Sequence, residues 1–240
     1  MKKILVLFLA FSAKLALAQA PGYDDLRILY ADGNFEKLVR ISSSYAEKDK
    51  TKNDAVVHLW YARGLYKISV SGSSDEKFKN AYKDAIGEMG KCLKLDKSKD
   101  VQTEYAEFIN EFKNSLVELI GNDISIPDYK KASSWVIKYY KLDINSIGSK
   151  YLEGTCKFRN GDKGGANTNW KDADKKLTAI TSIEDWSPAD KQLLKMGVLQ
   201  SAECLVSTRQ TDKAKALLGK VAQWYESDEE FKAKYDEIVN

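Results

Sequence analysis

The sequence is poor in histidine, cysteine and proline, and each shortage excludes a class of site. Its 240 residues include one histidine, three cysteines and three prolines. The cysteines are widely spaced, at Cys92, Cys156 and Cys204, and none belongs to a C-x-x-C pair. A transition-metal site therefore has too few good donors, and a disulfide framework is not indicated. We expect no metal and no cofactor.

The single histidine also limits the enzyme classes that remain. Any nucleophile activated by an imidazole would have to use His58, which lies at core spacing on a predicted helix. The glycine-rich segment 161–165 lacks the preceding strand and the Gly-Lys-Ser/Thr ending of a phosphate-binding loop, so a turn explains it better. The sequence favours a non-catalytic protein. An all-helical enzyme that brings two carboxylates together in one pocket is the alternative.

Each cysteine falls where a helix needs a small buried residue. Free cysteine behaves as a small hydrophobic residue, so we expect three buried free thiols. A disulfide between Cys156 and Cys204 is the alternative, and it requires their Cα atoms to lie close together.

The only long apolar run lies at the N-terminus, in residues 4–13, after the positive start Met1-Lys2-Lys3. It is followed by Ala16-Leu17-Ala18, a small-x-small pattern. These features predict a signal peptide over residues 1–18 that is cleaved before Gln19. Cleavage two residues later and an uncleaved anchor are the alternatives. Because no cysteine lies near the cut, a lipid anchor is excluded, and we expect a periplasmic or secreted protein.

The chain also has no excess of charge of either sign once the signal peptide is set aside. The chain has 38 lysines and arginines against 35 acidic residues, and three of the lysines lie in residues 1–18, which leaves 35 against 35. A neutral chain has no electrostatic signature for nucleic acid or for an anionic membrane surface. We expect no nucleic-acid partner and no membrane-spanning segment after cleavage, with peripheral association with a membrane complex left open.

What is present is helical periodicity, with no convincing alternating run. Helix-capping residues and turn residues divide the chain into hairpins, and Pro127 and Pro188 stand at predicted helix edges. Residues 226–240 are predicted to form a terminal helix with Phe231, Tyr235 and Ile238 on one face. The acidic run Asp228-Glu229-Glu230 is predicted to be a solvated start of that helix. The predicted hairpins pair residues 24–31 with 35–47, 54–68 with 75–95, 101–121 with 129–140, 146–159 with 164–177, and 187–209 with 213–224.

The chain also repeats itself. Tyr82-Lys83-Asp84-Ala85 runs on to Lys94-Leu95-Asp96, and Tyr129-Lys130-Lys131-Ala132 runs on to Lys141-Leu142-Asp143 with the same internal spacing. Self-similarity over tens of residues is typical of helical solenoids, in which each unit buries its apolar face by stacking on the next.

These segments resemble the tetratricopeptide repeat, a helix-turn-helix unit of about 34 residues. Gly154 stands where the first helix of the repeat needs a small residue, and Ala166, Trp170 and Ala173 reproduce its second helix. We expect Gly154 and Ala166 to tolerate no added bulk. The remaining matches are Ala62, Ala85, Met89 and Cys92 in one unit, and Ala132, Val136 and Tyr139 in the next. The sequence departs from the family where the closing proline is replaced by Lys97 and Ile144.

The resemblance implies an all-α fold, a right-handed α-solenoid of about five hairpins with a C-terminal capping helix, in a single domain over residues 19–240. It also implies that first helices line a groove for a partner protein. The residues matching that face are Arg63, Tyr66, Lys67, Tyr151, Thr155, Phe158, Arg159 and Arg209. The alternative is that the aromatic members pack between helices. Leu59 replaces the first lysine of the clamp found in cytosolic chaperone-binding members, which argues against that specificity.

The sequence therefore favours a non-catalytic, exported adaptor or scaffold that mediates protein–protein interactions in the bacterial periplasm. A narrower hypothesis is an accessory subunit of an envelope secretion, gliding-motility or outer-membrane assembly machine. A peptide- or carbohydrate-capturing nutrient-uptake protein is the alternative from another class. Each rests on fold-level analogy.

Overall fold

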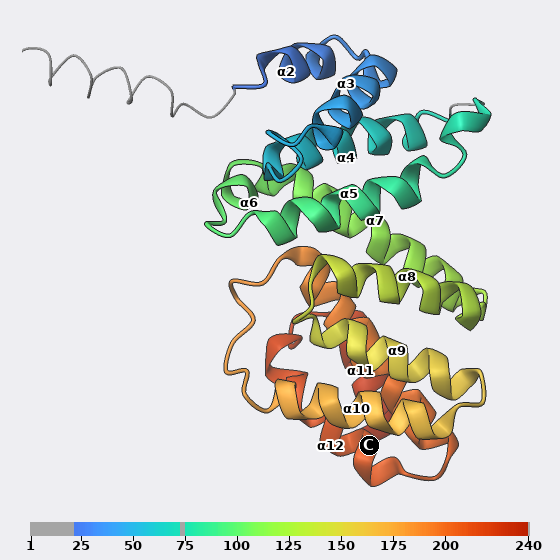
Figure 1. Ribbon diagram of the computed structural model, residues 1–240. Coiled ribbons are helices and arrows are strands. Elements are labelled where there is room, and N and C mark those ends of the chain that lie inside the picture. Colours follow the sequence, from blue (N-terminus) through green and yellow to red (C-terminus); the bar gives the residue numbers. More distant parts are fainter. Residues whose placement is uncertain (1–21, 73–74, 240) are drawn as a thin grey trace, which may run out of the picture. The chain divides into compact units, whose positions relative to one another are not determined.

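The structure, a computed structural model, describes residues 22–72 and 75–239, and every regular element within them is helical (Figure 1). These residues form twelve α-helices and two short 3₁₀ helices, with no strand among them. The prediction of an all-α protein is confirmed. The right-handed solenoid of about five hairpins stays a prediction, and the predicted signal peptide lies outside the described residues.

The chain divides into two compact units, Met1–Leu95 and Asp96–Asn240. Each unit has its own helices and its own buried residues. The single repeat domain over residues 19–240 stays a prediction.

The first unit is built from two helical pairs whose ends are set by side-chain caps. The Asn34 side chain accepts a hydrogen bond from the Lys37 amide, and the Asp54 side chain accepts one from the Val56 amide. Such caps satisfy amides that the first helical turn leaves unpaired. Because these capping residues are visible in the sequence, the predicted helix starts are confirmed here. The elements are α2 (Asp24–Ala31), α3 (Phe35–Glu47), α4 (Ala55–Val70), the 3₁₀ helix η1 (Glu76–Phe78) and α5 (Ala81–Leu95).

The second pair of this unit differs from prediction at its turn. The predicted helix from residue 75 onward is interrupted, because the Asp75 side chain caps η1 and α5 begins only at Ala81. Phe78 and Tyr82 are consequently half-buried. The repeat residues Ala85, Met89 and Cys92 on α5 are fully buried, as small and apolar residues on a second helix should be.

The second unit contains the remaining helices, and side-chain caps set the start of four of them. The side chains of Asp128, Ser146, Asp162 and Ser187 each accept a hydrogen bond from an amide of the first helical turn. The elements are α6 (Asp100–Glu104), α7 (Ala106–Ser125), α8 (Tyr129–Leu142), α9 (Ile147–Arg159), α10 (Lys163–Leu177), α11 (Pro188–Ser207), α12 (Thr211–Val221), the 3₁₀ helix η2 (Ala222–Trp224) and α13 (Glu229–Val239).

Two predicted helix ends in this unit are wrong. The helix predicted to break at Gly121 continues as α7 to Ser125. A side chain at position 121 would place its Cβ 3.2 Å from the methyl group of Met196, so the glycine leaves room for α11 rather than ending the helix. Arg209 lies beyond α11 with φ 60°, in the turn before α12, and not on a helix.

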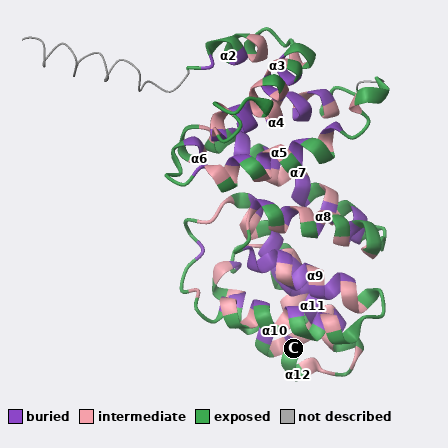
Figure 2. Cartoon of the chain, viewed as in Figure 1, coloured by how far each residue is buried: buried purple, intermediate pink, exposed green. Residues whose placement is uncertain are grey.

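Helices α9 and α11 pack in parallel and very closely. A Cβ on Gly148 would lie 2.5 Å from the backbone of Leu193 and Leu194, and further along Thr155 Oγ1 lies 3.1 Å from Ser201 Oγ. The contact later in α9 is made with a later residue of α11, so the two helices run in the same direction. Close backbone approach of this kind requires residues without side chains at the contact. Helix α9 is therefore buried along most of its length (Figure 2).

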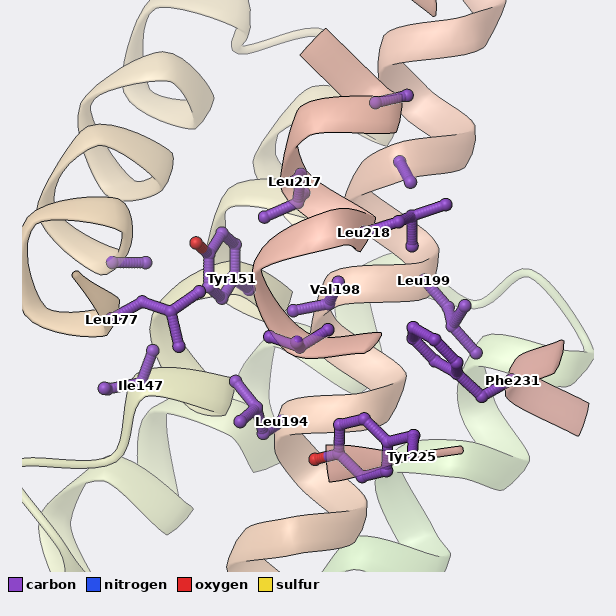
Figure 3. Close-up of a cluster of buried hydrophobic side chains, with 14 of the residues drawn as sticks. Ile147, Tyr151, Leu177, Leu194, Val198, Leu199, Leu217, Leu218, Tyr225 and Phe231 are labelled. Carbon is purple, nitrogen blue, oxygen red and sulfur yellow. The ribbon is translucent and has the colours of Figure 1, made fainter. Parts of the chain in front are cut away.

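The C-terminal core gathers apolar side chains from α9 to α13 (Figure 3). Phe231 of α13 is buried beside Tyr225, with ring centroids 5.2 Å apart, and Tyr235 and Ile238 pack against the same cluster. The predicted terminal helix with its apolar face turned to the core is confirmed. No helix among the described residues is both long and apolar enough to span a membrane.

Candidate functional site

The predicted partner residues of the first unit are half-buried or buried. The guanidinium of Arg63 lies 4.0 Å from the ring centroid of Tyr30 and 4.5 Å from that of Trp60. Tyr66 is only 6% exposed, and Lys67 Nζ lies 5.5 Å from its ring. Tyr66 is thus a core residue of its unit, as the packing alternative proposed.

Two predicted partner residues of the second unit, Tyr151 and Thr155, lie in the interior. Tyr151 is 1% exposed and donates a hydrogen bond from its hydroxyl to Asp174 Oδ1, 2.6 Å away. Burial and this bond raise the pKa of Tyr151 well above its usual value, so it stays a neutral donor. Thr155 is fully buried against Ser201. The prediction that Tyr151 and Thr155 belong to an exposed face of the first helix is therefore corrected. Both are buried because α11 covers this side of α9.

The other three predicted residues of this unit are more accessible. Phe158 is half-buried, with its ring centroid 5.7 Å from that of Trp170. Arg159 is exposed, with its guanidinium 5.6 Å from the ring centroid of Tyr129 and 3.9 Å from a Glu203 oxygen. Arg209 is exposed in the turn. These residues do not line a groove with Tyr151 and Thr155.

The single histidine is bound on both ring nitrogens. His58 is 3% exposed, its Nδ1 lies 2.6 Å from Glu88 Oε2, and its Nε2 lies 2.8 Å from the Lys52 carbonyl oxygen. Burial alone lowers the pKa of His58, but these two acceptors outweigh burial and raise it above 6.5. A protonated His58 donates to both acceptors and links the segment before α4 to α5.

We expect this arrangement to make the first unit less stable as the pH rises above 6.5. Because the pKa of His58 is raised on folding, its contribution is complete below the unfolded value of 6.5 and is lost as the pH rises through the folded value. A hydrogen bond to a charged group contributes about 1.5–3 kcal/mol, which sets the scale of the loss. As the pH is raised from below 6.5, the unfolding midpoint should fall for the wild type and stay constant for His58→Gln. Equal slopes in the two proteins would contradict the assignment.

All three cysteines are buried and free. Burial raises the pKa of Cys156 to about 12 and that of Cys204 to about 11, so neither thiol is ionised near neutral pH. The structure thus supports packing roles for these residues and holds no disulfide among the described cysteines.

Carboxylates do gather in one hollow of about 390 Å³ in the second unit, lined in part by Asp143, Asp185 and Asp190. Asp190 accepts hydrogen bonds from the Tyr139 hydroxyl, 2.6 Å away, and from Lys113 Nζ, 2.8 Å away. Both of its oxygens are therefore used to join α7, α8 and α11. The described residues contain no group of three or more His, Cys, Asp or Glu that could hold a metal ion.

An open groove lies between α10 and α12, and we call it the α10–α12 groove. It has a volume of about 300 Å³, and its floor comes from α9, α11 and the turn that follows α11. Four residues of each flanking helix line it at the spacing i, i+3, i+4, i+7, which places them on one helical face. They are Asn167, Trp170, Lys171 and Asp174 on α10, and Lys213, Ala216, Leu217 and Lys220 on α12, above Tyr151, Ser201, Leu205 and Gln210.

The Trp170 ring is held in place on the side of this groove. Its indole Nε1 donates to the Tyr151 carbonyl oxygen, 3.2 Å away, and a Cβ on Gly154 would lie 2.5 Å from the ring. The predicted close contact at Gly154 is therefore present, and its neighbour is Trp170. A half-buried aromatic ring fixed in this way is pre-organised for contact with a ligand.

The charge in the groove is positive. Its lining includes three lysines and one aspartate. Lys220 Nζ is neutralised by Asp174, at 3.0 Å, and Lys213 Nζ donates to the Gln210 side chain, at 2.7 Å. Lys171 and Lys213 form no ion pair with any residue that the structure describes.

No protein-family model matches this chain, and no curated protein sequence matches it.

The groove was missed because the prediction placed partner contacts on first helices. Its two walls are α10 and α12, the second helices of their hairpins, and Tyr151 on its floor is the one predicted partner residue among its lining residues. The sequence feature that could have indicated it is the shared i, i+3, i+4, i+7 spacing. It occurs once in residues 167–174 and again in residues 213–220. That spacing alone does not distinguish a groove from an ordinary exposed helix face.

Proposed function

We propose that this protein is a non-catalytic adaptor that holds a segment of a partner protein in the α10–α12 groove. The observation that carries the proposal is an open groove with a fixed Trp170 ring and the apolar side chains of Leu205 and Leu217, bordered by charged residues. Tryptophan is among the side chains most enriched at binding hot spots, and an apolar centre with a polar rim is typical of protein interfaces.

The match of residues 154–173 to the tetratricopeptide pattern supports this role. Gly154 approaches the second helix of its hairpin, the turn glycine Gly161 has φ 93°, and Ala166 is fully buried, all as the repeat pattern requires. Helix α13 covers the end of the C-terminal core, as capping helices do in repeat arrays. On this proposal the hairpins form a right-handed solenoid of about five units.

The proposed place of action is the bacterial periplasm, as part of an envelope scaffold or of a secretion, motility or outer-membrane assembly machine. The support is the pattern of residues 1–18, together with the balanced charge of the rest of the chain. N-terminal sequencing of the native protein tests the location. A start at Gln19 is expected, and retention of Met1 would count against export.

Site-specific photo-crosslinking tests the adaptor function. Ala216 is exposed and lines the groove, so a photo-reactive amino acid at this position faces a bound partner without disturbing the core. We expect adducts to one defined segment of an envelope protein when the label replaces Ala216. The matched control is the same label in place of Ala233, which is exposed on α13 and does not line the groove.

The crosslinked product also separates the two function classes. A peptide adduct that recurs at one site of one protein supports the adaptor. Adducts to an oligosaccharide would instead support the nutrient-uptake alternative, and identical products from both label positions would rule out the groove as the binding surface.

A further inference from the structure

We infer that the α10–α12 groove binds a short, extended, acidic segment that places one large apolar side chain on Trp170. This inference rests on the proposed function and names the chemistry of the partner. It is carried by three properties of the groove, which are its dimensions, its charge and its apolar contact surface.

The length of the groove fits a short extended chain. Asn167 and Asp174 lie seven positions apart on α10, and at a rise of about 1.5 Å per residue this face is about 10 Å long. An extended chain advances about 3.3 Å per residue, so the groove accommodates about three residues.

The charge selects an acidic segment. Lys171 and Lys213 stand on opposite flanking helices, and neither is paired with an acid among the described residues. The chain outside residues 1–18 carries equal numbers of positive and negative side chains, so this local surplus is not a consequence of a basic protein. Two cations across a narrow groove attract carboxylates on both sides of a bound chain, and such complementarity gives specificity.

The apolar surface selects a large side chain between those carboxylates. Trp170 offers a ring that is already held by its hydrogen bond to Tyr151 and by Phe158. Leu205 and Leu217 line the same hollow. An aromatic side chain stacked on Trp170 gains contact area and the additional attraction of an aromatic pair.

The test uses two synthetic peptides and the full chain. The first peptide has one phenylalanine flanked on each side by two glutamates, and the second has lysine in place of every glutamate. Binding is followed by NMR through the indole N–H signal of Trp170, assigned by comparison with Trp170→Phe. We expect the acidic peptide to shift this signal and to bind at least about tenfold more tightly than the lysine peptide, with affinity falling as salt is raised.

A charge-reversal variant locates the contact. Lys171→Glu with Lys213→Glu should weaken binding of the acidic peptide by about tenfold or more. The matched control, Lys130→Glu with Lys175→Glu, makes the same change in net charge at exposed lysines outside the groove and should leave affinity within about twofold. Circular dichroism of both variants confirms that they are folded.

The outcomes separate this inference from the proposed function. Equal binding of the two peptides, or equal losses in the variant and its control, would overturn acidic recognition. If neither peptide moves the Trp170 signal while the label at position 216 still crosslinks to a protein segment, the acidic chemistry fails and the adaptor function stands. If the crosslink also fails, both fail.

Discussion

Gly148→Ala is expected to destabilise the protein by about 3 kcal/mol, although alanine is normally the better helix former. The added Cβ would lie 2.5 Å from the carbonyl carbon of Leu193 and from the amide nitrogen of Leu194. These are backbone atoms of α11 and cannot rotate away, so α9 and α11 must separate. Overpacking of a well-packed interior costs about 1–3 kcal/mol, and a backbone clash lies at the upper end of that range.

Gly219→Ala provides the matched control for this substitution. Gly219 lies inside α12, and a Cβ at this position would meet no atom within 4 Å. Here alanine should stabilise the protein by about 0.5–1 kcal/mol, the ordinary gain for this exchange in a helix. Urea unfolding of both variants measures the difference. Changes of the same sign would show that α9 and α11 do not approach as closely as the structure indicates.

The contrast between Gly148 and Gly154 shows how far the sequence predicts packing. Gly154 was predicted as a close contact because its neighbour, Trp170, belongs to the next helix and to the same repeat pattern. Gly148 and Gly197 escaped prediction, although a Cβ on Gly197 would lie 2.8 Å from the Gly148 carbonyl oxygen. Their contact joins helices of two different hairpins. The periodicity within one helix shows which face is apolar and does not show how closely a distant helix packs against that face.

The helix starts that carry a side-chain cap were predictable for the opposite reason. The capping residues Asn34, Asp54, Ser146 and Ser187 act on amides only two or three residues away, so the sequence already contains both partners. The candidate site was predicted less well. Tyr151 has the aromatic character of a hot-spot residue, yet the packing of α11 on α9 places it in the interior. Whether an aromatic side chain faces a partner or the core depends on that tertiary contact.

The acidic run at the start of α13 is a second case in which a distant partner decides the role. The solvated helix start predicted for Asp228-Glu229-Glu230 is confirmed only in part. Asp228 caps the helix by accepting from the Phe231 amide, 2.9 Å away. It also accepts from Lys195 Nζ at 2.8 Å, and Glu230 accepts from the same nitrogen at 2.7 Å. Lys195 is only 6% exposed, so this ammonium group of α11 depends on two carboxylates from the start of α13.

Removing both carboxylates should therefore cost about 3 kcal/mol of stability. In Asp228→Asn with Glu230→Gln the helix cap can still form, because an asparagine oxygen also accepts from the Phe231 amide, but Lys195 is left charged and largely buried. Leaving a buried charge without its partner costs about 3–5 kcal/mol, and we take the lower end because Glu230 is well exposed and screened by solvent. Glu229→Gln, in the same acidic run and exposed, is the control and should change stability by less than about 0.5 kcal/mol.

Adding Lys195→Met to the double variant distinguishes an unpaired charge from simple loss of contacts at α13. Methionine fills a similar volume and carries no charge, so the triple variant should regain most of the lost stability.

The stability that Asp228 contributes should also depend on pH, in a direction set by its pKa. Burial raises the pKa of Asp228, but the hydrogen bonds from Lys195 and the Phe231 amide lower it below 3.8 overall. Its contribution is therefore present above that pH and is lost as the pH falls through the folded value. A triple variant no more stable than the double variant would mean that the acidic residues act by holding α13 in place, and that the buried charge of Lys195 is not the origin of the effect.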